Sequence, residues 1–222
     1  MTGYLPGTGF QPFPKIPRLN RDIVITEKID GTNAQVALIP EADIPEDDRR
    51  FVLGWHDLVE HDTEYDDFPS TRYGLLAGSR KRWLRPEKNE DNFGFAAWVD
   101  QWQAGPSGLV DTLGPGRHFG EWYGVGIQRG YGLRERRFAL FNTKRWSDVV
   151  LPDGVDVVPV LHEGPFSSAV VRHEVRFMAE NGSHIAPGFG NPEGVVVYHK
   201  ASNQLFKVTC ENDEQPKGQV AA

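Results

Sequence analysis

Short apolar stretches, rich in β-branched and aromatic residues and separated by turn residues, dominate the chain and predict β-strands. They lie at residues 23–26, 34–39, 50–55, 117–124, 137–142, 192–199 and 204–209. Two other segments repeat their apolar residues every three or four positions, which predicts helices at 93–103 and 167–180. Strands in hairpin-like pairs with interspersed helices predict an α+β fold, with mostly antiparallel β-sheets and flanking helices.

The segment between the first two strands contains Lys28 followed by Asp30 and Gly31. An Asp-Gly pair between two apolar runs predicts a short hairpin turn. Such a turn places Lys28 at a strand end, beside the carboxylates of Glu27 and Asp30. A lysine there acts as a nucleophile if desolvation or nearby cations keep its amine neutral. A solvated hairpin with a surface lysine is the alternative that this segment alone leaves open.

Composition limits the class of protein. The chain has 222 residues, of which 39% are hydrophobic, so it can bury a core as one large domain or two small ones. It contains neither a signal-peptide pattern nor an apolar run of roughly 18 residues, so we expect a cytoplasmic protein that does not enter a membrane. The single cysteine, Cys210, excludes an internal disulfide and a Cys-rich zinc site.

The chain is acidic overall, with 24 Lys and Arg residues against 31 Asp and Glu residues, for a net charge of -7. Broad nonspecific binding of nucleic acid depends on phosphate neutralisation and is therefore not expected. Any such contact must use a local basic patch, and residues 80–85 and 129–137 form the two candidates. The acidic stretch at 57–67 lacks the spacing of a calcium loop, and we interpret it as a solvated surface loop.

Two further features bear on chemistry. Glu121 lies among the apolar and aromatic residues of the strand at 117–124. It therefore either lies on a wet face of the sheet or accepts hydrogen bonds from a specific group. The glycine-rich segment at 124–130 lacks the Lys-Ser/Thr ending and the strand-to-helix context of a phosphate-binding loop, so that interpretation is rejected.

Several short motifs occur in a fixed order along the chain. They are Lys28-Ile29-Asp30-Gly31-Thr32-Asn33, Ser79-Arg80-Lys81-Arg82 with Asn92-Phe93-Gly94-Phe95, Phe119-Gly120-Glu121, Phe138-Ala139-Leu140-Phe141-Asn142, Glu193-Gly194-Val195-Val196 and Phe206-Lys207-Val208-Thr209. This ordered set resembles the covalent nucleotidyltransferase superfamily of ATP-dependent ligases and capping enzymes. Within the superfamily it is most similar to the RNA ligase 2-like group, for which the Thr32-Asn33 pair is typical.

The resemblance implies an adenylyltransferase, ligase-like fold in a single domain over residues 1–222. Residues 1–20, which are rich in proline and glycine, would form an extended N-terminal arm. Residues 210–222 would form a short tail, and no appended oligonucleotide-binding (OB) domain is expected.

The resemblance also implies a role for each motif residue. The implied catalytic residues are Lys28, Asn33, Arg80 and Lys207. The implied nucleotide-binding residues are Glu27, Lys28, Arg80, Glu121, Phe138, Glu193 and Lys207. Within this set Lys28 would carry AMP, Glu121 would accept from the ribose hydroxyls and Phe138 would stack on adenine. Glu193, and less strongly Asp30, would hold Mg²⁺ or Mn²⁺.

The implied activity is ATP-dependent RNA ligation, with RNA ends at a nick or on single strands as substrates and RNA repair as the setting. A DNA ligase or another lysyl-AMP nucleotidyltransferase is the alternative enzyme. Two departures from the family pattern, Asn142 for an acidic residue and Thr209 for a second lysine, keep a nucleotide- or RNA-binding module without turnover as a third hypothesis. No oligomeric state follows from the sequence.

Overall fold

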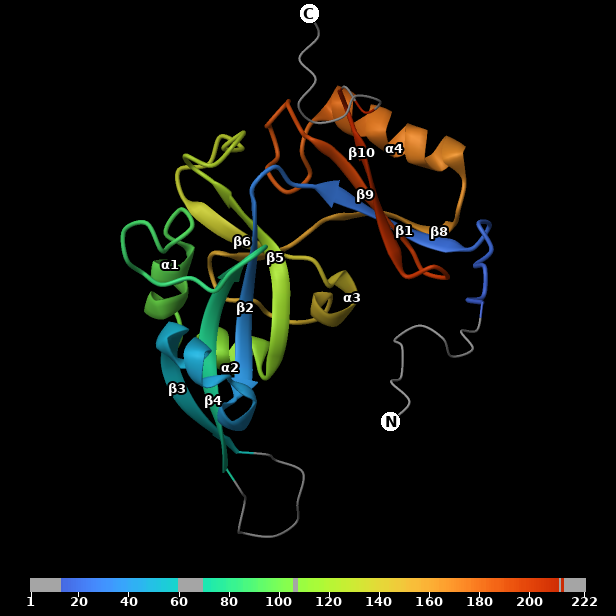
Figure 1. Cartoon of the computed structure of the whole chain (residues 1–222). Coiled ribbons are helices and arrows are strands. Elements are labelled where there is room, and N and C mark those ends of the chain that lie inside the picture. The colour runs from blue at the N-terminus through green and yellow to red at the C-terminus, as the bar shows by residue number, and fades with distance from the viewer. Residues whose placement is uncertain (1–12, 60–69, 106–107, 212, 214–222) are drawn as a thin grey trace, which may run out of the picture.

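The computed structural model of the chain describes residues 13–59, 70–105, 108–211 and 213, and it contains two β-sheets (Figure 1). The larger sheet has the order β3 (Val52–Val59), β4 (Ser70–Ser79), β2 (Thr32–Pro40), β5 (Gly116–Gly124), β6 (Arg136–Leu140) and β7 (Val155–Val157). The smaller sheet has the order β10 (Gln204–Thr209), β9 (Gly194–His199), β1 (Asp22–Lys28) and β8 (Val160–Pro165). Apart from the parallel β6–β7 pair, neighbouring strands are antiparallel, which confirms the predicted α+β class.

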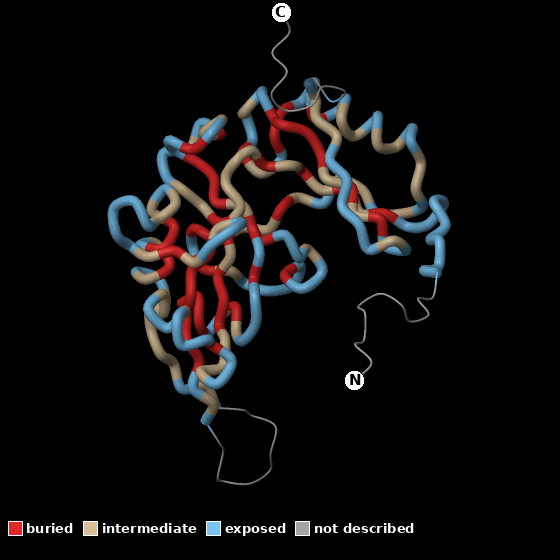
Figure 2. Tube along the Cα trace, viewed as in Figure 1, coloured by how far each residue is buried: buried red, intermediate tan, exposed pale blue. Residues whose placement is uncertain are grey.

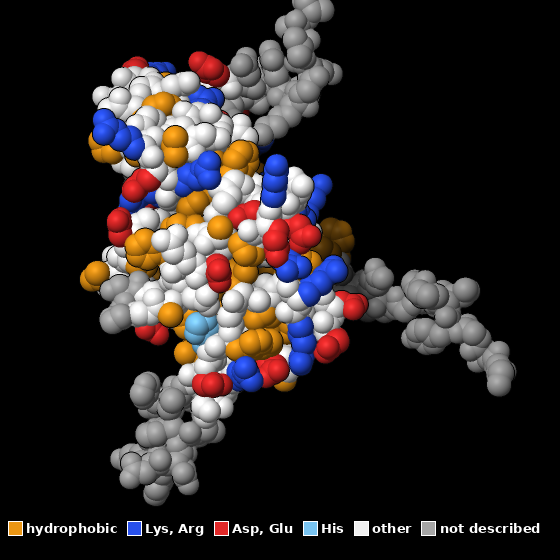
Figure 3. Space-filling view, turned by 90° about the vertical axis from the view of Figure 1, so that its left-hand side faces the viewer, with side chains coloured by type: hydrophobic (Ala, Val, Ile, Leu, Met, Phe, Trp, Pro, Cys, Tyr) orange, Lys and Arg blue, Asp and Glu red, His pale blue; other side chains and the backbone are white. Residues whose placement is uncertain are grey.

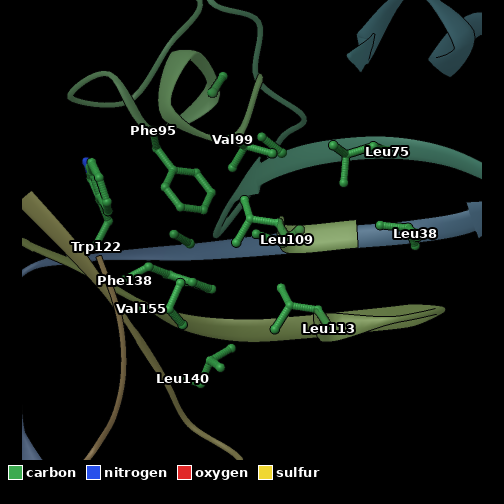
Figure 4. Close-up of a cluster of buried hydrophobic side chains, with 14 of the residues drawn as sticks. Leu38, Leu75, Phe95, Val99, Leu109, Leu113, Trp122, Phe138, Leu140 and Val155 are labelled. Atoms are coloured by element: carbon green, nitrogen blue, oxygen red, sulfur yellow. The ribbon is translucent and has the colours of Figure 1, made fainter. Parts of the chain in front are cut away.

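The main hydrophobic core lies against one face of the larger sheet (Figures 2 and 4). Helices α1 (Phe95–Gln101) and α2 (Leu109–Leu113) supply Phe95, Val99 and Leu109, while the sheet supplies Leu75 and Phe138. These five side chains are at most 1% exposed. Burying a side chain of this size contributes about 1.5–3 kcal/mol, so this cluster holds the larger sheet together. The short helix α3 (Thr143–Trp146) follows β6.

A second core lies between the smaller sheet and helix α4 (Ser168–Asn181). Ile23 and Ile25 of β1 pack there with Val195 and Val197 of β9 and with Met178 of the helix. Because side chains alternate along a strand, the even-numbered residues of β1, including Lys28, lie on the opposite face of this sheet. That alternation frees one face of the smaller sheet for polar side chains.

The predicted hairpin of β1 and β2 is wrong, because the two strands belong to different sheets (Figure 1). Ile29, Asp30 and Gly31 carry the chain from one sheet to the other. Ile29 is buried in a third apolar cluster, with Tyr123, Tyr131, Ala139, Val158 and Ala186. Gly31 lies so close to β5 that a Cβ atom there would be 2.4 Å from the Trp122 carbonyl oxygen. The Asp-Gly pair thus forms a crossing between sheets, which local turn chemistry does not distinguish from a hairpin.

The other predicted helices, strands and terminal segments are confirmed only in part. The predicted pairing of β9 with β10 and both predicted helices are confirmed, although α1 is shorter than expected. Residues 46–51 form a 3₁₀ helix rather than the start of a strand, and β4, β7, β8, α2 and α3 were not anticipated. Residues 13–20 of the expected arm are exposed and contain neither helix nor strand, whereas residues 1–12, residues 60–67 of the acidic stretch and most of the tail lie outside the described residues.

Two expectations about the whole chain remain. The single domain stays a prediction. Among the described residues, every helix is too short or too polar to span a lipid bilayer.

Candidate active site

Lys28 and Glu193 form an ion pair at the edge of the smaller sheet where β1 ends and β9 begins. Lys28 ends β1 and lies opposite Gly194, the first residue of β9, so the register brings the preceding Glu193 beside it. The Lys28 Nζ donates to Glu193 Oε2, and the two side chains are only 21% and 10% exposed. Gly194 permits this arrangement, because its φ is 151° and a Cβ atom there would lie 2.2 Å from the Val208 carbonyl oxygen.

The crossing after Lys28 is anchored to the larger sheet by two hydrogen bonds. The Asp30 amide donates to the Tyr131 hydroxyl over 2.7 Å, and the Gly31 amide donates to Glu121 Oε1 over 3.2 Å. Glu121 therefore lies beside the segment that follows Lys28. This contact answers the question that the sequence left open, because the Glu121 carboxylate accepts from a specific donor.

The environment of Glu121 raises the pKa of its carboxyl group from 4.5 to about 7. Burial is the largest cause, because it removes water from the charged form. The charge of Lys28 and the hydrogen bond from Gly31 oppose this effect, while the negative charges of Glu193 and Asp30 add to it. Glu121 therefore titrates near neutral pH, which is a property of functional sites.

Glu27 lies on the other face of β1 from Lys28 and is 1% exposed. Its carboxylate accepts from the Ser183 hydroxyl over 2.6 Å and from the His184 and Ile185 amides over 2.9 Å each. These three donors occupy the carboxylate within the protein. The expected nucleotide contact by Glu27 stays a prediction, and in this structure its side chain fixes the end of β1.

The expectation that Phe138 stacks on adenine stays a prediction, and the burial of this side chain argues against it. Phe138 is fully buried on the helix-facing side of the larger sheet, with its ring centroid 5.2 Å from that of Phe95 (Figure 4). The opposite face carries Glu121, which lies directly across from Ala139 in β6. Alternation places Phe141 on this face with Glu121, and the Phe141 side chain is 41% exposed. The neighbouring Phe119 is 47% exposed on the same face.

Asn33 and Arg80 meet in a surface hollow of about 420 Å³, which is also lined by Thr32, Ser79, Lys81, Arg82 and Asn92. Asn33 lies opposite Glu121 in the β2–β5 pair, so the two side chains share a face. The Asn92 side-chain amide donates to the Thr32 hydroxyl over 2.9 Å and closes one wall of the hollow. The fold thus brings the second motif, around Arg80, next to the end of the first.

Lys207 is exposed on the face of the smaller sheet that carries Lys28. It lies opposite Val196 in β9, and Val196 lies opposite Thr26 in β1. The structure therefore places both lysines on one face but records no contact between them.

Asn142, one of the two departures from the family pattern, is the N-cap of α3. Its side-chain oxygen accepts from the Arg145 amide over 3.2 Å. In this chain the position therefore has a structural role at the start of a helix.

The donor set fits a hard divalent cation at Glu193 better than at Asp30. Magnesium takes oxygen ligands, keeps several waters and needs only one or two carboxylates beside substrate phosphates. Glu193 supplies one such carboxylate next to Lys28. The Asp30 carboxylate is instead paired with Arg129 over 3.0 Å. The described residues contain no cluster of three or more His, Cys, Asp or Glu side chains arranged to enclose a metal.

Sequence reasoning missed Arg129 and Tyr131, both of which contact the crossing after Lys28. Both lie in the glycine-rich segment 124–132, of which residues 124–130 were considered as a phosphate-binding loop and residues 129–137 were included in a basic patch. The available signal was an arginine and a tyrosine among four glycines in nine residues. That composition indicates a tight loop but does not reveal what the loop contacts.

A family model described as RNA ligase matches residues 21–209 of this chain. The chain belongs to the RNA ligase family. The match confirms the resemblance to RNA ligases, and it contains every candidate site residue of this chain, from Glu27 to Lys207. No curated protein sequence matches the chain.

Solved structures of a Naegleria gruberi RNA ligase are similar to this chain. A mutant with AMP and Mn is 16% identical with a TM-score of 0.48, and a second mutant with ATP and Mn is 15% identical with a TM-score of 0.47. Each match covers 86% of this chain and 50% of the Naegleria chain. The present chain therefore spans about half the length of those RNA ligases.

Proposed function

We propose that this RNA ligase joins 5'-phosphate and 3'-hydroxyl RNA ends in an ATP-dependent reaction that passes through AMP bound covalently to Lys28. The observation that carries the proposal is the placement of the Lys28 amine. The Lys28 side chain is 21% exposed and contacts Glu193, and the Gly31 amide, three residues further along the chain, donates to Glu121. A partly buried lysine is suited to nucleophilic catalysis when its amine is neutral, and the contact with Glu193 fixes where that amine lies.

In the first step the Lys28 Nζ lone pair attacks the α-phosphorus of ATP. A nitrogen–phosphorus bond forms, the bond from the α-phosphorus to the bridging oxygen breaks, and pyrophosphate leaves with the electron pair. The amine loses its proton to solvent. Negative charge increases on the leaving group, so fixed cations stabilise this transition state more than the ground state. Lys207 and Arg80 are the cations that we assign to the phosphates.

The nucleoside contacts follow from the face that carries Glu121. We assign the Glu121 carboxylate to the ribose hydroxyls, because it lies beside Gly31 near Lys28. Phe141 replaces Phe138 as the adenine platform, since an exposed aromatic face stacks well on a base. The two assignments place sugar and base along one face of β5 and β6.

A divalent cation, Mg²⁺ or Mn²⁺, completes the site in this proposal. When bound, it neutralises phosphate charge and orients the phosphates. Glu193 would hold it. The Glu193 carboxylate also orients the Lys28 amine, with which it is in contact.

Two further steps complete ligation. An oxygen of the RNA 5'-phosphate attacks the AMP phosphorus, which releases Lys28 and forms an adenylated end. The 3'-hydroxyl then attacks the 5'-phosphorus, so that the phosphodiester forms and AMP leaves. The hollow lined by Asn33 and Arg80 is suited to these ends, because it offers cations and an amide beside Glu121. Basic and acidic side chains are interspersed on the face in Figure 3, so we expect RNA contact to use such local groups.

The test is incubation of the protein with α-labelled ATP and magnesium, followed by denaturing electrophoresis. The label should stay on the wild-type protein, vanish in acid and persist in alkali, as a lysyl phosphoramidate does. Lys28→Ala should carry no label. Mass spectrometry of the purified protein controls for AMP already bound. A wild-type protein that neither carries AMP nor accepts label would refute the lysyl-AMP mechanism and favour a binding module.

A second assay addresses the substrate. The adenylated protein should seal nicked or single-stranded RNA ends faster than matched all-DNA ends. The Thr32-Asn33 pair and the family match motivate this preference. Faster sealing of all-DNA nicks would favour the DNA ligase alternative.

A further inference from the structure

Arg129 connects the two segments that carry the candidate catalytic groups. Its Nε donates to Asp30 Oδ2 over 3.0 Å, which ties it to the crossing that follows Lys28. Its Nη1 donates to the backbone oxygen of Asn191 over 3.1 Å, to Asn191 Oδ1 over 2.6 Å and to the Pro192 carbonyl over 3.4 Å. Pro192 directly precedes Glu193. One guanidinium therefore binds both the segment that follows Lys28 and the segment that precedes Glu193.

The loop that carries Arg129 is held in an unusual conformation. Gln128 and Tyr131 have φ values of 43° and 53°, in the left-handed region that side chains other than glycine rarely adopt. Between them, Gly130 has a φ of 66°. Backbone strain of this kind opposes folding and persists only where the surroundings enforce it.

The enforcing contacts come from Tyr131. Its ring packs against Tyr123 and Phe189, with centroid distances of 5.6 and 4.8 Å, and its hydroxyl accepts from the Asp30 amide. The loop is thereby fixed to β5, to the crossing after Lys28 and to the segment between α4 and β9, so Arg129 is held in a defined position.

We infer that Arg129 is a positioning residue for lysine adenylation: it holds Glu193 against Lys28 by bridging Asp30 to Asn191 and Pro192. The inference rests on the proposed function for its kinetic consequence, but the bridge itself is a structural relation that is tested separately. The fork of a guanidinium reaches a carboxylate and carbonyl oxygens at once, which a lysine ammonium at the same place does not reproduce.

A role in overall stability does not account for these contacts. The Arg129 and Asp30 side chains are 25% and 28% exposed, and ion pairs that remain accessible to water contribute little to stability. The contacts are instead directed at backbone oxygens next to a candidate catalytic residue. Misplacement of a catalytic group by about 1 Å can slow a reaction on the order of a hundredfold.

The kinetic test uses the full chain with Arg129→Ala and Arg129→Lys. Both variants should reduce the single-turnover rate of adenylation by about 10- to 100-fold, while the KM for ATP changes less than about threefold. Added guanidinium should restore part of the adenylation rate of Arg129→Ala and should leave the rate of the wild type unchanged. The matched control is Arg49→Ala, which removes an exposed arginine paired with Glu41 and Glu46, and its rate should stay normal.

Amide hydrogen exchange tests the bridge independently of activity. The reporters are the amides of Asp30, Gly31 and Cys210, because they donate to Tyr131, Glu121 and the Glu193 carbonyl respectively. In Arg129→Ala they should exchange at least about tenfold faster, whereas amides of α1 should not change.

Two results would overturn the inference. One is unchanged exchange at the three reporters in Arg129→Ala. The other is an adenylation rate within about twofold of the wild type. If the wild type never adenylates but the reporters respond, the bridge stands as a structural relation and the proposed lysyl-AMP mechanism fails.

Discussion

Thr209 lies in line with Lys28 across the smaller sheet, with Gly194 between them. Lys28 pairs with Gly194 in β9, and Gly194 pairs with Thr209 in β10. Residues paired in this way project from the same face, and two strand spacings separate the outer pair by roughly 9.5 Å. Because Gly194 has no side chain, it places no side chain between position 209 and Lys28.

This relation predicts the effect of Thr209→Lys. The new ammonium would lie on the Lys28 face beside the ATP phosphates and would supply the second lysine of the family pattern. We expect the variant to fold and to adenylate faster than the wild type, because a further cation stabilises the departing pyrophosphate. Thr209→Gln controls for side-chain length. Equal single-turnover rates for the two variants would show that position 209 does not face the phosphates.

Lys207 is expected to be required for adenylation. Lys207→Ala should reduce the single-turnover rate by on the order of a hundredfold, as the loss of one preorganised electrostatic group does. The control is Lys200→Ala, which removes an exposed lysine from the turn between the same two strands. Unfolding in urea should show that both variants remain within about 0.5 kcal/mol of the wild type. A near-normal rate for Lys207→Ala would mean that the last motif is assigned wrongly.

Glu121→Gln should change the pH dependence of stability. The pKa of the Glu121 carboxyl group is raised to about 7 in the folded protein. Below pH 4.5 the group is protonated in both states and its burial costs no ionisation energy. As pH rises from 4.5 to 7 the group ionises more readily in the unfolded state, so the free energy of unfolding falls. The amide removes this cost. The variant should therefore gain stability over the wild type as pH increases from 5 to 8, by up to about 3 kcal/mol.

Urea unfolding at pH 5, 6, 7 and 8 measures this gain. Glu163→Gln is the control, because Lys200 lowers the pKa of the Glu163 carboxyl group and its charge is constant over this range. A difference between Glu121→Gln and the wild type that does not vary with pH would contradict the raised pKa.

Phe138 and Phe141 should respond in opposite ways to substitution. Phe138→Leu should cost about 1–2 kcal/mol of stability, because it leaves space in the core, but should not change the KM for ATP. Phe141→Ala should leave stability within about 1 kcal/mol and raise the KM for ATP about tenfold, because base stacking is lost. Thermal unfolding and ATP titration of single-turnover adenylation measure the two effects. A raised KM in Phe138→Leu alone would restore the original assignment.

The sequence determined the family and the local elements of this protein. The apolar stretches predicted the strands β1, β2, β5, β6, β9 and β10, because the alternation of side chains is a local property. Motif order identified Lys28, Glu121, Glu193 and Lys207 as candidates. In the structure Lys28 contacts Glu193, Glu121 accepts from the Gly31 amide in the crossing, and Lys207 lies on the same face of the smaller sheet as Lys28.

Tertiary structure alone decided which side chains meet. The Asp30-Gly31 pair has the same local chemistry in a hairpin and in a crossing between sheets, and only the partners of β1 and β2 distinguish them. Phe138 and Phe141 both lie in one aromatic motif, but the register of β6 against β5 buries one and exposes the other. Arg129 contacts residues 62 and 99 positions away in the chain. Such contacts depend on how the two sheets pack, which the pattern of neighbouring residues does not encode.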